Sequence, residues 1–115
     1  QILIYPVISF GRYTHMGSRN NLLGKDTTSE FISYFSNELQ VNAKSPKAFL
    51  VHAKNDEAVP IENAWMYKTS LEKSGVSVQL IEFEKGGHGF GMINSTSNID
   101  WPTLLTEWLK KENIL

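Results

Sequence analysis

Two residues of this chain have the types and the setting needed for acid–base chemistry, a histidine and an aspartate. His88 lies among four glycines in the stretch Glu84 to Gly91, directly after the mostly apolar run Val78 to Phe83. Asp56 lies in a polar stretch just past another apolar run, Ala48 to Val51. An aspartate that accepts the Nδ1 proton of a histidine fixes the ring tautomer and stabilises the imidazolium. The two residues are therefore candidates for the acid and the base of a hydrolytic triad.

Each residue also has a simpler explanation. His88 could be a solvated residue of a glycine-rich turn, and Asp56 could be a turn residue of a polar loop. The glycines around His88 favour a functional role, because they indicate a backbone that needs positive φ or the close approach of another group. We interpret His88 as displayed by its loop rather than packed in a core.

The elements between the two residues predict that they meet. A helical pattern from Glu62 to Ser74, closed by Gly75, separates the strand at 47–51 from the strand at 78–83. A crossover of this length suits parallel strands, whose C-terminal ends share one edge of the sheet. Sequential strands are usually neighbours, with a right-handed crossover. We therefore expect Asp56 and His88 to be close together at that edge.

The remaining segments predict an α/β fold of about three parallel strands with flanking helices. Ile2 to Tyr5 reads as a first, buried strand, and residues 10–26 as irregular except for a short helical turn at 19–23. Thr27 and Glu30 have the spacing of a capping box and predict a helix start. The next apolar residues share one face and are expected to pack in the core, with an acyl-binding wall as the alternative: Phe31, Tyr34, Phe35 and Leu39.

The C-terminal residues predict an amphipathic helix that docks on the sheet. Its apolar positions recur at helical spacing, and Pro102 falls in the first turn, where a missing N–H costs little. These positions are Trp101, Leu104, Leu105, Trp108 and Leu109.

Length and composition exclude several classes of function. The 115 residues suffice for one domain, and the 11 basic and 12 acidic residues are scattered, so no nucleic-acid partner is expected. The absence of cysteine excludes disulfides and a cysteine nucleophile. His15, His52 and His88 lack metal-ligand spacing, so no metal site is predicted. The longest apolar run, Ile2 to Ile8, is too short for a membrane span, and the compartment stays open.

The nucleophile of a triad is missing from the chain. In α/β-hydrolases it lies in a G-x-S-x-G elbow, and the triad order is serine, acid, histidine. The nearest candidate is Ser9, which has the glycine two residues later but not the one two residues earlier. The chain begins with Gln1 and runs straight into a strand, so we expect a single partial domain, residues 1–115, from the C-terminal portion of a larger protein.

Several segments carry a resemblance to a known family. They are Leu3 to Ser9, Thr14 to Ser18, Leu22 to Gly24, Ala48 to Ala53, Asn55-Asp56 with Val59-Pro60 and Asn63, and Gly86 to Gly91. Together they make the chain resemble the C-terminal third of an α/β-hydrolase of the esterase/lipase type, in particular the bacterial acetyl esterase and xylan esterase-like group.

The resemblance implies a serine esterase for short acyl esters, including those on carbohydrate, with no cofactor. It implies Asp56 as the triad acid and His88 as the general base. The nucleophile and oxyanion hole would come from residues upstream, so the isolated chain is expected to be inactive. Prolyl-oligopeptidase-like peptidases and dienelactone hydrolases have similar acid and histidine loops, which keeps a peptidase as an alternative.

A non-catalytic docking or dimerisation module is a further alternative. The first strand has no sequential neighbour before it, and its residues Ile2 to Tyr5 carry no charge that would discourage pairing. We therefore expect self-association, or pairing with a missing N-terminal portion, through this edge.

Overall fold

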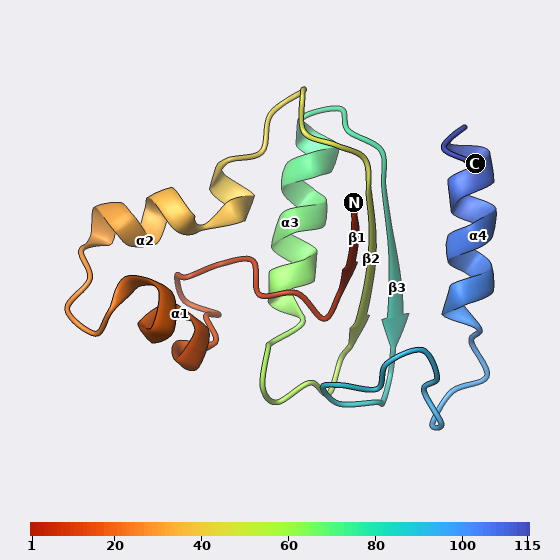
Figure 1. Ribbon diagram of the computed structural model, residues 1–115, viewed down its shortest axis with the longest axis horizontal. Helices are drawn as coiled ribbons and strands as arrows, with labels where there is room; N and C mark the ends of the chain where they lie inside the picture. Colours follow the sequence, from red (N-terminus) through yellow and green to blue (C-terminus); the bar gives the residue numbers. More distant parts are fainter.

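The computed structural model describes residues 1–115 and contains a three-stranded parallel sheet between helices (Figure 1). Its strands are β1 (Ile2–Ile4), β2 (Ala48–Ala53) and β3 (Val78–Phe83), in the order β1-β2-β3. Ile4 pairs with Val51, and Val51 with Ile81. The fold class predicted from the sequence is thus confirmed, with β2 at the centre and β1 paired on one side only.

The central strand β2 is completely buried because its alternating side chains serve two cores. Ala48 and Leu50 pack towards α3 (Glu62–Lys73) with Tyr67 and Leu71. The opposite face carries Phe49, Val51 and Ala53, which pack with Trp101 and Trp108 of α4 (Trp101–Lys111). Figure 1 shows the resulting layers, with α3 and α4 on opposite faces of the sheet.

Helices α3 and α4 form where the sequence predicts them. The buried face of α3 includes Ala64, Tyr67 and Leu71, as expected, and the chain leaves the helix through Gly75 at a φ of +71°. The carboxylate of Asp100 caps α4 by accepting the N–H of Thr103. None of the helices has the length and hydropathy needed to cross a membrane.

The segment between β1 and β2 differs from the prediction. It contains α1 (Met16–Leu23), α2 (Ser29–Phe35) and the short 3-10 helix η1 (Asn37–Leu39). The residue that caps α2 is Thr28 rather than Thr27, because its hydroxyl reaches the N–H of Phe31 at 3.3 Å. Glu30 then falls inside the first turn and cannot complete the predicted capping box.

The helical run also ends earlier than its apolar spacing suggests. Ser36 is buried, donates its hydroxyl proton to the Ile32 carbonyl and accepts the N–H of Phe10. The next N–H, of Asn37, donates to Ile8 instead of continuing the helix. These bonds to the chain after β1 divide the predicted helix into α2 and η1.

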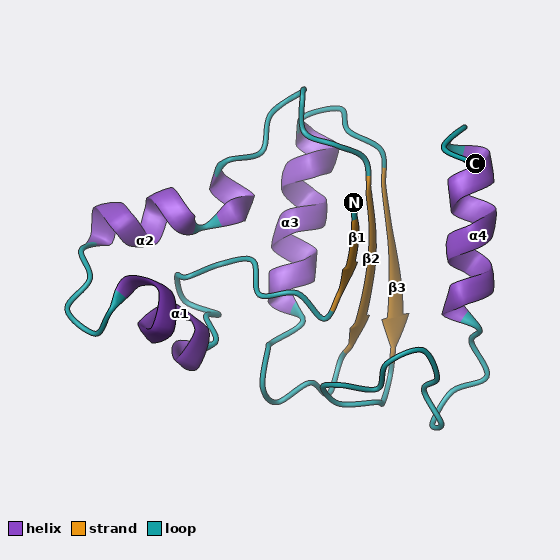
Figure 2. Cartoon of the chain, viewed as in Figure 1, coloured by secondary structure: helices purple, strands orange, loops and turns teal.

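The apolar face of α2 and η1, which we call the α2 face, does not pack in the core, so the prediction of core packing was wrong. Its four side chains are largely exposed: Phe31 by 55%, Tyr34 by 66%, Phe35 by 37% and Leu39 by 62%. Figure 2 shows the reason, because α1 and α2 project to the side of the sheet that lies beyond α3. The pattern identified an apolar surface correctly but not the element that would cover it.

Candidate active site

The acid loop begins where β2 ends. The N–H of Asp56 donates to the carbonyl of Ala53, which turns the chain sharply after the strand. The carboxylate then points inwards, and its Oδ1 accepts the N–H groups of Ala58 at 3.0 Å and Val59 at 2.9 Å. Oδ2 accepts the Nδ1 proton of His88 at 2.8 Å. Both oxygens of Asp56 are therefore engaged, and His88 makes the shortest side-chain contact.

Electrostatics keep this carboxylate charged although it is buried. Burial by itself raises the pKa of Asp56, but the N–H donors of Val59, His88 and Ala58 outweigh it and hold the pKa below its ordinary value. Asp56 is consequently ionised at neutral pH, which the orienting acid of a triad requires.

The histidine loop owes its shape to glycine at two positions. Gly87 has a φ of +63°, and its N–H donates to the side-chain oxygen of Asn55 at 3.0 Å, which ties the histidine loop to the acid loop. Gly86 lies so close to Asn94 that a Cβ atom there would be 2.5 Å from the amide nitrogen. Substitution of Gly86 would therefore displace the loop that carries His88.

The imidazole of His88 is oriented by these contacts for proton transfer. A carboxylate can only accept, so in the neutral ring the proton is on Nδ1 and the lone pair is on Nε2. The ring is 39% exposed and lies against Tyr5, with 4.5 Å between the ring centroids. Tyr5 also contacts Phe90 at 5.0 Å. Nε2 is therefore free to take a proton while the ring face is held.

Two residues of this site were missed by sequence reasoning. Tyr5 follows β1 with a φ of +41°, a left-handed conformation that is costly for an aromatic residue. No sequence pattern around Tyr5-Pro6 predicts a positive φ at Tyr5. His52 is buried in β2, and its Nε2 is 3.3 Å from the Oδ2 of Asp56. Its position four residues before Asp56 was the one available signal.

Ser9, the weakly supported candidate nucleophile, occupies a structural position. Its N–H donates to the side chain of Asn63, and its buried hydroxyl accepts the N–H of Gly11 at 3.1 Å. No contact joins Ser9 to His88. The structure thus brings together Asp56 and His88 but not Ser9.

Comparison with known proteins places this geometry in a family. The model of the prolyl oligopeptidase family matches residues 5–113, which include the acid and histidine loops. The chain belongs to the prolyl oligopeptidase family. It is 37% identical over 100 residues to endo-1,4-beta-xylanase B of Butyrivibrio fibrisolvens, a match that covers 87% of this chain and 16% of the xylanase.

Solved structures of an acetyl ester-xyloside hydrolase and of a carboxylesterase contain the same arrangement of strands and helices. An acetyl ester-xyloside bifunctional hydrolase from Caldicellulosiruptor lactoaceticus superposes with a TM-score of 0.95 at 33% identity, over 99% of this chain and 42% of that one. A carboxylesterase from Lactobacillus plantarum superposes with a TM-score of 0.78 at 27% identity, over 99% and 44%. The chain thus spans less than half the length of these relatives and forms part of their fold.

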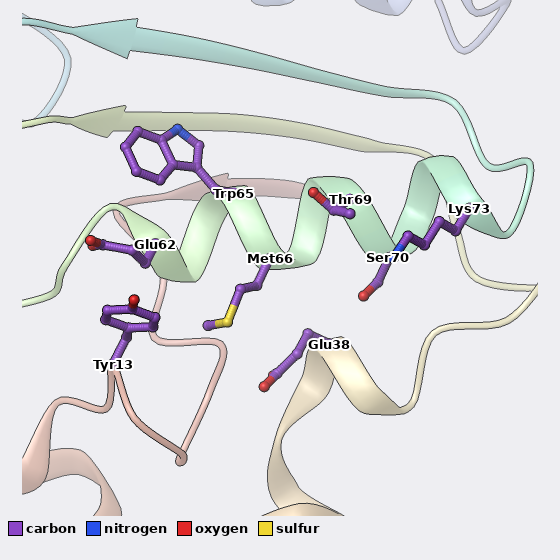
Figure 3. A pocket seen from close by; sticks show the side chains of 8 residues that line it. All are labelled: Tyr13, Glu38, Glu62, Trp65, Met66, Thr69, Ser70 and Lys73. Carbon is purple, nitrogen blue, oxygen red and sulfur yellow. The ribbon is translucent and has the colours of Figure 1, made fainter.

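Two pockets on the surface of this family member differ in whether they adjoin the candidate active site. A pocket of about 370 Å³ lies directly beside the acid and the histidine, lined by Asn55, Glu57, Ala58, Gly87 and His88. A second pocket of about 340 Å³ runs along α3 between Tyr13 and Glu38, and Figure 3 shows Met66 and Ser70 facing it. The second pocket contains neither Asp56 nor His88, so it is separate from the candidate active site.

Proposed function

We propose that the full-length protein is a serine esterase in which Asp56 and His88 are the acid and the general base of a Ser-His-Asp triad. The observation that carries the proposal is the 2.8 Å bond from His88 Nδ1 to the buried, ionised carboxylate of Asp56. The relatives support it, because their names describe esterases and hydrolases. The serine and the oxyanion donors would come from residues outside this chain, which has no G-x-S-x-G sequence.

The proposed reaction has two halves. His88 Nε2 takes the proton of the serine hydroxyl while the serine oxygen bonds to the ester carbonyl carbon. The carbon–oxygen bond to the leaving alcohol then breaks, and His88 returns the proton to that alcohol. Water, deprotonated by the same ring, hydrolyses the acyl-enzyme and regenerates the serine. Asp56 stabilises the imidazolium in both halves without becoming protonated.

Short acyl esters are the proposed substrates, with acetyl groups on carbohydrate as the leading candidate. Support comes from the printed names of two relatives, the acetyl ester-xyloside bifunctional hydrolase and xylanase B. The test is hydrolysis of 4-nitrophenyl acetate and of acetylated xylo-oligosaccharides by the full-length protein, with His88→Ala as the control. Loss of both activities in the variant is expected, and equal activity of variant and native protein would contradict the triad.

A peptidase is the second candidate, favoured by the family model that matches the chain. Its acyl group would come from a peptide, and proline-containing peptide nitroanilides are the direct probe. Cleavage of these peptides at a higher kcat/KM than the acetate esters would replace the esterase proposal with the peptidase.

The isolated 115-residue chain should be inactive on activated acetate esters. It lacks a positioned serine, and the loss of even one oxyanion donor costs about 10² to 10³ in rate. Its turnover should match that of a His88→Ala version. Stoichiometric labelling by a serine-reactive phosphonate would contradict this, and labelling at Ser9 would identify a nucleophile within the chain.

The free edge of β1 should also find a partner, either a second copy of the chain or the N-terminal part of the same protein. β1 is paired on one side only, and Ile2 is 47% exposed there. Light scattering of the isolated chain should give a mass that rises with concentration. A constant mass near 13.0 kDa would show that the edge needs no partner.

A further inference from the structure

We propose that His52 is a positioning residue for the triad acid, donating its Nε2 proton to Val59 and to Asp56 Oδ2 and so holding the carboxylate in line with His88. This inference rests on the proposed function of Asp56. It concerns a buried histidine that has no part in the proton transfers described above.

The contacts place the His52 ring directly behind the acid. His52 projects from β2 and is completely buried, as is the Asp56 side chain. Its Nε2 lies 2.9 Å from the carbonyl oxygen of Val59 and 3.3 Å from Asp56 Oδ2. Val59 in turn donates its own N–H to Asp56 Oδ1. The ring therefore contacts both the carboxylate and the loop that holds it.

The tautomer of His52 follows from its partners. A carbonyl oxygen can only accept a hydrogen bond, so the short contact to Val59 requires a proton on Nε2. The other ring nitrogen, Nδ1, is buried without a hydrogen-bond partner, which favours its unprotonated form. Burial also lowers the pKa of His52 below 6.5, so the ring is neutral at neutral pH. His52 therefore faces the Asp56 carboxylate as a neutral hydrogen-bond donor and not as an imidazolium cation.

This donor restrains the oxygen that His88 uses. Two backbone N–H groups hold Oδ1, but Oδ2 is held only by His88 and His52. His88 is partly exposed and belongs to a glycine-rich loop, whereas His52 belongs to the completely buried central strand, which is paired on both sides. With His52 removed, the carboxylate could pivot about Oδ1 and take the His88 ring with it. A displacement of about 1 Å in a catalytic group can cost about 10²-fold in rate.

Two variants of the full-length protein separate donation from packing. His52→Phe fills the space without a donor, and His52→Gln places an amide N–H near the position of Nε2. We expect His52→Phe to lower kcat on 4-nitrophenyl acetate by about 10- to 100-fold with less than about a twofold change in KM. His52→Gln should recover most of that loss. Unchanged kcat in His52→Phe, or equal losses in both variants, would overturn the donor role.

Nuclear magnetic resonance of the ¹⁵N-histidine-labelled native protein provides a test that does not depend on activity or on the folding of variants. The two-bond correlations of His52 should have the pattern of a neutral Nε2–H ring at pH 7. An Nδ1–H ring or a protonated ring would contradict the proposal. If the native protein hydrolyses no ester, the esterase function fails, but this spectrum still decides whether His52 donates to the acid loop.

Discussion

The C-terminal edge of the sheet and the α2 face are built in opposite ways. At the edge, Asp56 accepts three hydrogen bonds of 3.0 Å or less, and its side chain is excluded from solvent. On the α2 face, four large apolar side chains are exposed by 37% to 66%, and Tyr34 and Phe35 contact each other with 5.1 Å between their ring centroids. The polar groups of the first region find their hydrogen-bond partners within the chain, whereas the apolar side chains of the second are not covered by it.

The difference shows which features of a site depend on local geometry. The acid and the histidine follow adjacent strands, so pairing of β2 with β3 is enough to bring them together. The α2 face has no such constraint, because its helices lie in a connection between β1 and β2. An exposed apolar surface of this kind is typical of a site where another segment or molecule binds.

The largest expected effect on activity comes from replacing Asp56 at the C-terminal edge of the sheet. Asp56→Asn keeps the shape of the side chain but no longer favours a proton on His88 Nδ1, and it should lower kcat of the full-length protein about 10⁴-fold. The exposed Asp26, changed to Asn, is the matched control and should leave kcat unaltered. Steady-state kinetics on 4-nitrophenyl acetate measures both. A loss below tenfold in Asp56→Asn would mean that Asp56 is not the triad acid.

The next effect compares the two regions by stability. Phe49 is completely buried against Trp108, so Phe49→Ala should lower the free energy of unfolding by about 3–5 kcal/mol. Phe31→Ala on the exposed α2 face should cost less than about 1 kcal/mol. Chemical denaturation of the full-length protein gives both values. A loss of several kcal/mol in Phe31→Ala would show that another part of the protein covers the α2 face.

A smaller effect should follow from the support of the His88 ring. Tyr5→Ala removes the ring that packs on His88, and we expect kcat to fall about tenfold because the base becomes less well oriented. Tyr34→Ala, which deletes an equal side chain from the α2 face, serves as control. Equal kinetics in the two variants would show that the contact of Tyr5 with His88 has no role in catalysis.

The smallest effect concerns pH and stability. Burial lowers the pKa of His52 in the folded protein. Just below pH 6.5 the unfolded chain therefore binds a proton at His52 that the folded chain does not bind. The free energy of unfolding consequently falls as the pH drops. The lowered pKa of Asp56 acts in a separate window, below pH 3.8. His52→Phe should therefore flatten the dependence of stability on pH just below pH 6.5. An unchanged slope would mean that His52 titrates normally.

The sequence predicted the sheet, the crossover helix and the two loops because each has a local signal. Apolar runs mark β2 and β3, the spacing of Ala64, Tyr67 and Leu71 marks α3, and the glycines mark the His88 loop. These signals agree with one another and with the rules of parallel sheets. The juxtaposition of Asp56 and His88 followed from them, whereas their catalytic roles stay a prediction.

The features that escaped prediction depend on contacts distant in the sequence. The break of the helix at Ser36 comes from Phe10 and Ile8, more than twenty residues away. His52 looked like one more residue of a buried strand, because its partners lie on the loop that follows. The positive φ of Tyr5 arises where the chain turns after β1, and no residue type there requires it. Such features need the three-dimensional arrangement before they can be recognised.

The contact between Tyr5 and His88 has a further consequence for the reach of the base. Neighbouring strands are about 4.8 Å apart, so β1 and β3 are separated by about 10 Å across β2. His88 follows β3, yet its ring lies 4.5 Å from the ring of Tyr5 at the end of β1. The side chains of Tyr5 and His88 therefore together bridge the distance between the ends of β1 and β3. Deletion of one glycine from the His88 loop would therefore draw the imidazole away from the ring of Tyr5 and change the direction from which Nε2 can accept a proton.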